Sequence, residues 1–253
     1  MKATFLGHDK PLLTAMVIRK TPEDFIDIIN KSLADGAEAI GLQMEHLERQ
    51  YRTREIITSI FEACQGKPIY VTSYRSDASE GMTDEACAEY LLFLADCGAT
   101  LCDFQSNLFD KAAPREYTKD PVAVEKQKAL IAEIHRRGAQ VMMSAHTGSL
   151  LTPAETLELA RAQIERGSDI SKIVNGSDDA SLPSCIETIQ LLKKELGAPY
   201  LYLVGGACAK TIRQIGPSLG VHMYLCVHMH GELDASLQPL IVPLKAVRDN
   251  MVF

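Results

Sequence analysis

Two residues with complementary chemistry stand in neighbouring apolar segments of the sequence. Lys172 lies inside ISKIV, residues 170–174, and His146 ends MMSAH, residues 142–146. Burial disfavours an unpaired ammonium, and the neutral amine can attack a ketone to form an imine. An imidazole titrates near neutrality and can both remove and return a proton. The pair therefore predicts imine chemistry with acid–base assistance, provided that the two segments lie side by side.

Each of these residues also has a simpler interpretation. The lysine could extend its ammonium to the rim of a sheet, or it could pair with a carboxylate. A single histidine is more often a packed or surface residue than a catalyst. Only Lys172 and His146 together, on adjacent strands, favour the catalytic hypothesis.

Two arginines could hold an anionic ligand. Arg213 follows the apolar segment 200–204, and Arg75 follows the segment 69–74. A guanidinium presents a planar fork of donors that matches a carboxylate. Arg213 is therefore a candidate carboxylate-binding residue, with a solvated helix surface as the alternative. Arg75 could bind substrate, or it could pair with a neighbouring acid.

Polar residues near the C-terminus suggest two further roles. His228 and His230 alternate along a strand-like segment, so their side chains share a face. No suitable third ligand is evident, and we expect no metal site. Ser236 and Gln238 follow in a polar segment that could cover a binding site.

The elements that would position these residues follow from a weak internal repeat. Seven times, a helix-like stretch ends in a glycine, and a short β-rich run begins two or three residues later. Glycine can close a helix in the left-handed conformation. The spacing runs from 23 residues (Gly197 to Gly220) to 40 (Gly98 to Gly138), the scale of one strand and one helix. The glycines are Gly36, Gly66, Gly98, Gly138, Gly167, Gly197 and Gly220.

An eighth unit precedes the first of these glycines. Residues 12–18 form an apolar run, and Thr21-Pro22 then predicts a helix start, with Thr as N-cap and Pro at the first helical position. Eight β-then-α units predict a parallel sheet with right-handed crossovers. A length of 253 residues suits one barrel. We therefore expect an α/β fold, a (β/α)8 TIM barrel, as a single domain over residues 1–253. A doubly wound sheet would favour a Gly-rich phosphate loop, and Val17 to Lys20 is not one.

In such a barrel the functional site lies at the C-terminal ends of the strands. The residues at the predicted strand ends are Arg19, Gln43, Glu45, Arg75, Asp103, Gln105, His146, Lys172, Gly205, Gly206, His228 and His230.

Composition narrows the class of partner. The net charge of −7, without a Lys/Arg cluster, argues against nucleic acid or an anionic membrane as partner. The sequence has no apolar stretch that suits a signal peptide or a membrane span. The seven cysteines lack zinc-site spacing. We expect buried thiols in a reducing, cytoplasmic setting and a small-molecule substrate.

Several motifs along the chain resemble one family of enzymes. They are Ser144 and His146 followed by Thr152-Pro153, Asp169 to Ile173 around Lys172, Arg213 followed by Gly216-Pro217, Arg75 with Glu80-Gly81, Lys20-Thr21, and Gln238. Together they resemble the type I 3-dehydroquinate dehydratases, Schiff-base-forming lyases of the shikimate pathway of aromatic amino acid biosynthesis, over nearly the whole chain. The resemblance implies a homodimer without cofactor or metal. It makes Lys172 and His146 catalytic and Arg213 carboxylate-binding. The other substrate-binding candidates are Arg75, Gln238, Ser236, Glu80 and Gln43.

By this resemblance, Lys172 condenses with a ring ketone and the protonated imine acidifies the neighbouring carbon. His146 removes a proton there, giving an enamine, and a β-hydroxyl is then lost with the proton that His146 returns. Water finally releases the product from Lys172.

The sequence departs from the family at the side of the pocket that faces the ring hydroxyls. The family's second strand usually carries Glu-x-Arg-x-Asp, whereas residues 41–45 read GLQME here, and its fourth-strand Asp-x-Glu is DFQ at 103–105. The lid serine is also replaced, by Asp234, four residues before Gln238. We therefore expect retained chemistry on 3-dehydroquinate or on a related cyclic keto acid. Gly41→Glu with Gln43→Arg is expected to raise dehydroquinate activity, if space allows.

Two other hypotheses stay open. A class I aldolase-like barrel would use the imine to break a carbon–carbon bond and would not depend on Arg213. A non-catalytic binding relative would have little reason to retain both Lys172 and His146.

Overall fold

Eight parallel strands form the inner wall of the fold in the computed structural model, which describes residues 3–76, 81–231, 233 and 236–253. The strands alternate with helices along the chain, as the sequence predicts. They are β1 (Leu12–Val17), β2 (Ala39–Gln43), β3 (Ile69–Thr72), β4 (Leu101–Gln105), β5 (Gln140–His146), β6 (Ile170–Asn175), β7 (Tyr200–Val204) and β8 (Met223–Cys226).

The strands pair in the order β7-β6-β5-β4-β3-β2-β1-β8, all in parallel. The two ends of this order, β7 and β8, approach each other at their starts, where the backbone N–H of His222 donates to the carbonyl of Tyr200 at 3.0 Å. Neighbours in sequence are thus neighbours in space around a nearly closed ring. This is the predicted (β/α)8 barrel, and the doubly wound alternative is wrong.

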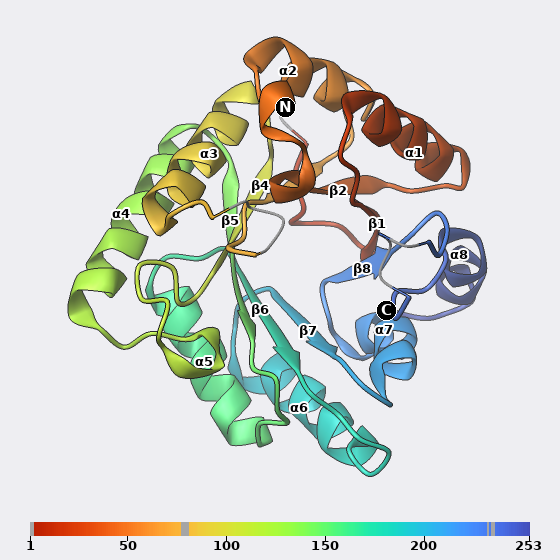
Figure 1. The fold of residues 1–253 in the computed structure, drawn as a ribbon. Helices are drawn as coiled ribbons and strands as arrows, with labels where there is room; N and C mark the ends of the chain where they lie inside the picture. The colour runs from red at the N-terminus through yellow and green to blue at the C-terminus, as the bar shows by residue number, and fades with distance from the viewer. Residues whose placement is uncertain (1–2, 77–80, 232, 234–235) are drawn as a thin grey trace.

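Eight α-helices in the described residues surround the strands, with the last of them returning to the side of the first (Figure 1). They are α1 (Pro22–Ala34), α2 (Arg54–Glu62), α3 (Asp84–Cys97), α4 (Pro121–Arg136), α5 (Pro153–Glu165), α6 (Leu182–Glu195), α7 (Ala209–Leu219) and α8 (Ile241–Asp249). Short 3-10 turns lie in the loops, namely η1 (Met44–His46), η2 (Arg49–Tyr51) and η4 (Pro114–Glu116).

Local signals place the helix ends. Thr21 caps α1 by accepting from the N–H of Asp24, and Thr152 forms a reciprocal capping box with Glu155 at the start of α5. All seven glycines of the repeat have positive φ, from 68° to 131°. Gly98 ends α3 in the left-handed conformation, which a side chain would strain. The repeat is therefore confirmed as a series of helix stops.

One strand end differs from the prediction. Strand β3 stops at Thr72, so Tyr74 and Arg75 lie in the loop that follows it rather than at its end. The backbone N–H of Arg75 donates to the side-chain Oε1 of Gln105 at 3.1 Å, so a side chain takes the place of a strand partner. This puts Tyr74 at the mouth of the barrel.

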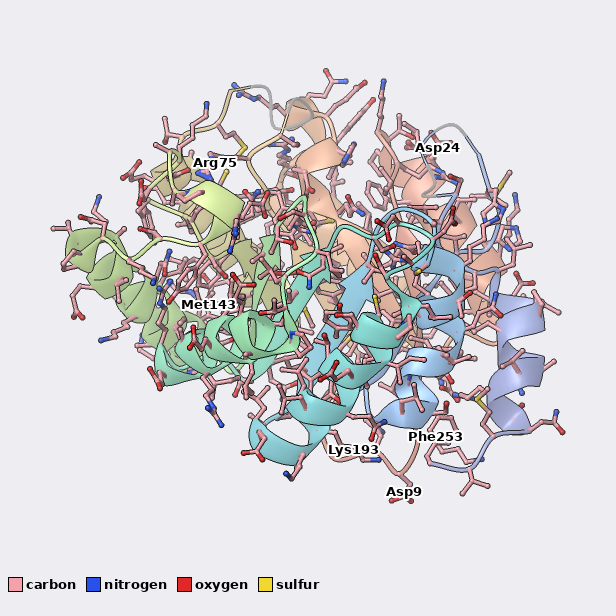
Figure 2. All side chains as sticks on the ribbon, turned by 90° about the horizontal axis from the view of Figure 1, so that it is seen from below. Asp9, Asp24, Arg75, Met143, Lys193 and Phe253 are labelled. Carbon is pink, nitrogen blue, oxygen red and sulfur yellow. The ribbon has the colours of Figure 1, made fainter. Side chains whose placement is uncertain are left out.

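Different residues mark the two ends of the barrel. Arg75 and Asp24 lie towards one end of the molecule, whereas Asp9, Lys193 and Phe253 lie at the opposite end (Figure 2). The first end holds the C-terminal ends of the strands. Six of the seven cysteines are buried, and none of the seven, all within the described ranges, forms a disulfide. Among the described helices, none is long and apolar enough to span a membrane.

Candidate active site

Lys172 forms the centre of a buried polar cluster inside the barrel. Only 5% of its surface is exposed. Its Nζ donates to the hydroxyl of Tyr70 at 2.9 Å, to the hydroxyl of Tyr74 at 3.0 Å and to Oδ2 of Asp103 at 3.0 Å. The carboxylate-paired interpretation of this lysine is therefore confirmed. Pairing and a catalytic role are compatible, because the same contacts hold the amine at one point.

Strand register brings these residues together. Lys172 of β6 is opposite Ser144 of β5, and Asp103 of β4 is opposite Thr72 of β3. Side chains two residues apart on a strand share a face, so His146 lies on the same face as Ser144. The prediction that Lys172 and His146 stand on adjacent strands is confirmed, and the register places their side chains on the same face.

Asp103 provides the negative charge of the cluster. It is completely buried, and its Oδ2 accepts from the hydroxyls of Tyr70 and Tyr74, both at 2.5 Å. Burial first, and then the charge of Asp103, raises the pKa of each phenol well above its ordinary value. Both tyrosines therefore stay protonated and act as donors to the carboxylate. The other oxygen, Oδ1, is buried without a hydrogen-bond partner in the described residues.

His146 is held by a carboxylate that sequence reasoning missed. Glu116 Oε2 accepts from Nδ1 of His146 at 2.8 Å and from its backbone N–H at 3.0 Å. Gln105 Nε2 donates to the other oxygen of Glu116 at 3.1 Å. Burial alone would raise the pKa of Glu116, but the hydrogen bonds and charge of His146 lower it below its usual value. Glu116 is thus a carboxylate that fixes the imidazole and leaves Nε2 to exchange protons with a ligand.

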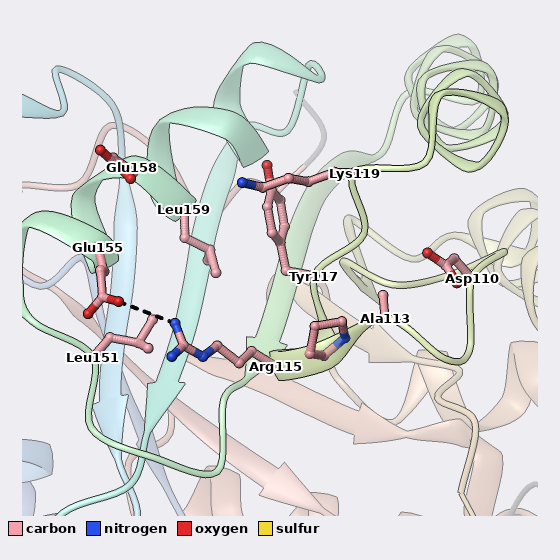
Figure 3. A pocket seen from close by; sticks show the side chains of 10 residues that line it. Asp110, Ala113, Arg115, Tyr117, Lys119, Leu151, Glu155, Glu158 and Leu159 are labelled. Carbon is pink, nitrogen blue, oxygen red and sulfur yellow. Dashed lines mark hydrogen bonds and ion pairs between the residues drawn. The ribbon is translucent and has the colours of Figure 1, made fainter.

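The turn that carries Glu116 is strained. Arg115 and Glu116 both have left-handed backbone, with φ of 57° and 51°, which costs roughly 1 kcal/mol or more per residue. Arg115 forms an ion pair with Glu155 of α5 at 3.3 Å across a cavity of about 690 Å³, which Tyr117 and Leu159 also line (Figure 3). Contacts from α5 and from His146 therefore hold the turn. No sequence motif marks this residue, since the strain and the contact arise only in the folded chain.

A second cavity opens beside His146. It measures about 440 Å³, within the range of small-molecule sites, and lies at the C-terminal ends of β5, β6 and β7. Its lining residues are His146, Gly148, Val174, Asn175, Gly176, Ser177, Gly205 and Gly206. The glycines leave backbone rather than side chains at the wall. A ligand in this cavity would meet the imidazole of His146.

Arg213 and Gln238 have unused polar atoms. The Nε and Nη1 of Arg213 and the Oε1 of Gln238 are buried without hydrogen-bond partners in the described residues. Burial lowers the pKa of Arg213 to about 10. An unpaired buried guanidinium is costly, and an anionic ligand would relieve that cost. This arrangement fits the predicted carboxylate-binding role of Arg213.

The remaining predicted binding residues are scattered. Arg75 donates to Asp84 at 2.6 Å and to Asn107 at 2.8 Å, so the alternative of pairing with a neighbouring acid is confirmed and its role in substrate binding stays a prediction. Gln43 is half-buried at the end of β2, and Ser236 is exposed. Glu80 and Asp234 lie outside the described residues.

His228 and His230 each contact another group of the protein. His228 Nδ1 contacts Asp35 at 2.6 Å, and His230 Nε2 contacts the carbonyl of Gln238 at 2.8 Å. Within the described part of the chain, no group of three His, Cys, Asp or Glu side chains could hold a metal ion. His230 thus contacts the backbone of Gln238, the residue whose side-chain Oε1 has no hydrogen-bond partner among the described residues.

The room that a glutamate at position 41 requires is not available in the structure. A Cβ at Gly41 would overlap Sδ of Met16 and lie 2.9 Å from Cδ1 of Tyr70. The space that a longer side chain needs is filled by these two residues. Side chains therefore occupy the place where the resemblance predicts a glutamate.

Gly41→Glu should destabilise the protein rather than restore an activity. Overpacking a core typically costs about 1–3 kcal/mol, and burying a carboxylate adds to it. The unfolding midpoint in urea should fall for Gly41→Glu and, by less, for Gly41→Ala. Adding Met16→Ala to Gly41→Ala should recover part of the loss. A midpoint unchanged by Gly41→Glu would contradict the packing described here.

Glu45 is a buried acid close to the polar cluster around Lys172 and Asp103. It accepts from Oγ1 of Thr72 at 2.7 Å, and desolvation raises its pKa from 4.5 to about 7 against that hydrogen bond. The folded protein therefore binds a proton that the unfolded chain releases between pH 4.5 and 7. The stability that protonated Glu45 contributes is fully present below pH 4.5 and is lost as the pH rises through about 7.

Glu45→Gln should remove this pH dependence. The free energy of unfolding of the variant, minus that of the unmodified protein, should increase from pH 4.5 to pH 7 and then level off. Denaturant titrations at several pH values measure this difference, in which the other titrating groups cancel. A difference that stays flat would show that Glu45 is ionised in the folded state.

Known structures share this fold. No known family signature matches the sequence, and no curated protein matches it significantly. A type I 3-dehydroquinate dehydratase from Clostridium difficile, with covalently modified comenic acid, has a TM-score of 0.79 and 17% identity, over 96% of this chain and 93% of that one. The 3-dehydroquinate dehydratase from Geobacillus kaustophilus has a TM-score of 0.78 and 13% identity, over 96% and 91%.

An enzyme of another reaction class is also similar. The carboxyl transferase domain of Rhizobium etli pyruvate carboxylase has a TM-score of 0.69 and 12% identity, over 98% of this chain and 44% of that one. One barrel can serve different reactions, so activity has to be argued from the side chains. These likenesses show a (β/α)8 barrel shared with enzymes, among them the 3-dehydroquinate dehydratases.

Proposed function

We propose that this protein is an imine-forming lyase that dehydrates 3-dehydroquinate or a related cyclic keto acid. The observation that carries the proposal is the buried amine of Lys172, on the strand next to that of the carboxylate-paired His146. Similarity of fold to the 3-dehydroquinate dehydratases supports it, since the same strands would carry the reacting groups.

The proposed reaction uses these side chains in sequence. The Lys172 amine bonds to the ketone carbon, and the carbonyl oxygen leaves as water, which gives a protonated imine. His146 Nε2 removes a proton from the neighbouring carbon, and the electron pair passes into the imine nitrogen as an enamine. The electron pair then returns from the enamine nitrogen and expels the β-hydroxyl group as hydroxide. The hydroxide takes the proton from His146 and becomes water. Hydrolysis then frees Lys172.

Arg213 would hold the carboxylate of the substrate. Two of its donors and the amide oxygen of Gln238 are buried without hydrogen-bond partners among the described residues, and polar groups of a bound keto acid would satisfy them. Arg213→Ala should raise KM about 10- to 100-fold for the acid, the scale of lost charge-assisted hydrogen bonds, but only slightly for its neutral amide. Arg213→Lys should recover part of the loss. Equal effects on acid and amide would place the anion site elsewhere.

The packing at Gly41 bears on the choice of substrate. Met16 and Tyr70 fill the place from which the family's glutamate would reach a ring hydroxyl. A site that lacks such a hydrogen-bonding partner discriminates poorly in favour of that hydroxyl. This supports a related keto acid over 3-dehydroquinate itself.

Borohydride trapping tests the proposal. The protein is incubated with 3-dehydroquinate, comenic acid or other cyclic keto acids, then reduced, digested and analysed by mass. We expect a stable increment on the peptide that contains Lys172. With a true substrate, we also expect ultraviolet absorbance from the conjugated enone. An increment on another lysine, or none with any of these acids, would refute the imine mechanism.

A further inference from the structure

One phenol contacts both halves of the candidate active site. The hydroxyl of Tyr74 accepts from Lys172 Nζ at 3.0 Å and lies 2.8 Å from Oγ of Ser144. Its ring meets that of His146 edge to face, with centroids 5.7 Å apart. Tyr74 therefore stands between the amine that would form the imine and the imidazole that would move the proton on carbon.

A second phenol, Tyr70, makes the same contacts with Lys172 and Asp103 but in a different place. Tyr70 is completely buried in β3, and its ring packs edge-on against Phe5 at 6.4 Å. Tyr74 is half-buried in the loop after β3, at the mouth of the barrel. Only Tyr74 of this pair can touch a ligand that enters from the mouth.

Imine formation needs two proton transfers that the other groups are poorly placed to make. Two of the three protons of the Lys172 ammonium must reach the carbonyl oxygen, which leaves as water, and the third stays on the imine nitrogen. Asp103 is completely buried, and its Oδ2 already accepts from two phenols and the ammonium. His146 is oriented by Glu116, with Nε2 left for the carbon-bound proton.

We propose that Tyr74 is a catalytic residue that relays both protons from Lys172 to the carbonyl oxygen of the ligand, an inference that rests on the proposed imine function. Tyr74 first turns its proton from Oδ2 of Asp103 to the carbonyl oxygen of the ligand. As one proton passes from Nζ to the phenol oxygen, Tyr74 gives its own proton to the carbonyl oxygen, and the nitrogen lone pair bonds to the carbonyl carbon. The second transfer follows the same path. It protonates the hydroxyl of the carbinolamine, which leaves as water while the lone pair forms the carbon–nitrogen double bond.

The surroundings of Tyr74 favour exchange over a free phenolate. Burial and the charge of Asp103 make the phenolate unfavourable, so the phenol has to receive one proton as it releases another. Ser144 can accept from or donate to Tyr74 while the proton moves. Tyr74 ends each transfer as it began, and no oxidant or cofactor is required.

The rate of borohydride-trappable imine formation tests the relay. Tyr74→Phe removes only the hydroxyl, and general acid–base assistance is typically worth about 100-fold or more. We expect trapping with a keto acid that labels the unmodified protein to slow by about 100-fold, while the final extent is preserved. Tyr70→Phe is the matched control, since it removes a hydroxyl with the same two partners, and it should slow trapping much less.

The outcomes separate this proposal from the proposed function. If the unmodified protein is never trapped, imine chemistry fails altogether. If it is trapped and Tyr74→Phe reacts at the same rate, or if Tyr70→Phe slows it equally, the relay is refuted while the imine lysine stands. Should Tyr74→Phe fail to fold, as judged by circular dichroism, Ser144→Ala provides the test. Ser144→Ala removes the hydroxyl that orients the phenol of Tyr74 and should slow trapping by about 10-fold, the scale of one lost hydrogen bond, and an unchanged rate would overturn the proposal.

Discussion

Lys172→Met should abolish covalent trapping by borohydride and reduce turnover to background. Methionine keeps the length and packing of the side chain but has no amine to bond to a ketone. Trapping is measured as the mass of the Lys172 peptide, and turnover as ultraviolet absorbance of the product. Lys193→Met, an exposed position at the opposite end of the barrel (Figure 2), should leave both unchanged.

Loss of the lysine also removes the counter-charge of a buried carboxylate. Asp103 is completely buried and its ion pair with Lys172 is 3.0 Å long. Breaking a buried pair on one side typically costs about 3–5 kcal/mol. Adding Asp103→Asn to Lys172→Met should therefore recover most of the lost stability but none of the trapping. Recovery of trapping in that double variant, through another lysine, would contradict the assignment.

His146→Ala should separate binding from chemistry. The imidazole is proposed to move protons rather than hold the ligand, so trapping at Lys172 should persist while turnover falls about 100- to 10,000-fold. Single-turnover trapping and steady-state absorbance measure the two quantities on the same preparation. Parallel loss of both would make His146 a binding or structural residue instead.

Glu116→Gln should weaken turnover without removing the imidazole of His146. Glutamine can still accept from Nδ1 of His146 but carries no charge, whereas the hydrogen bonds and charge of His146 lower the pKa of the native carboxyl. Turnover should fall by less than in His146→Ala, because the amide still fixes the orientation of the imidazole but lacks the negative charge of the carboxylate. An unchanged turnover would limit Glu116 to holding the turn.

The sequence was sufficient to predict the barrel because the signals that start and end each helix lie within a few residues of one another. Each helix stop depends on one glycine with positive φ, and starts such as Thr152-Pro153 depend on hydrogen bonds within one turn. Eight repeats of that pattern determine a parallel barrel. They also place Lys172 and His146 on consecutive, hence adjacent, strands.

The neighbours of those two residues were decided only by the tertiary structure. Tyr74 lies 98 positions from Lys172 and Asp103 lies 69 from it, and they meet because the barrel brings β3 and β4 to face β6. Glu116 reaches His146 from a strained turn that no local propensity favours. At position 41 the resemblance to the dehydratases predicts a glutamate where this chain has glycine, whereas only the packed side chains of Met16 and Tyr70 show that the space is occupied. Contacts across the barrel depend on strand register and closure, and these are properties of the whole ring rather than of any one segment.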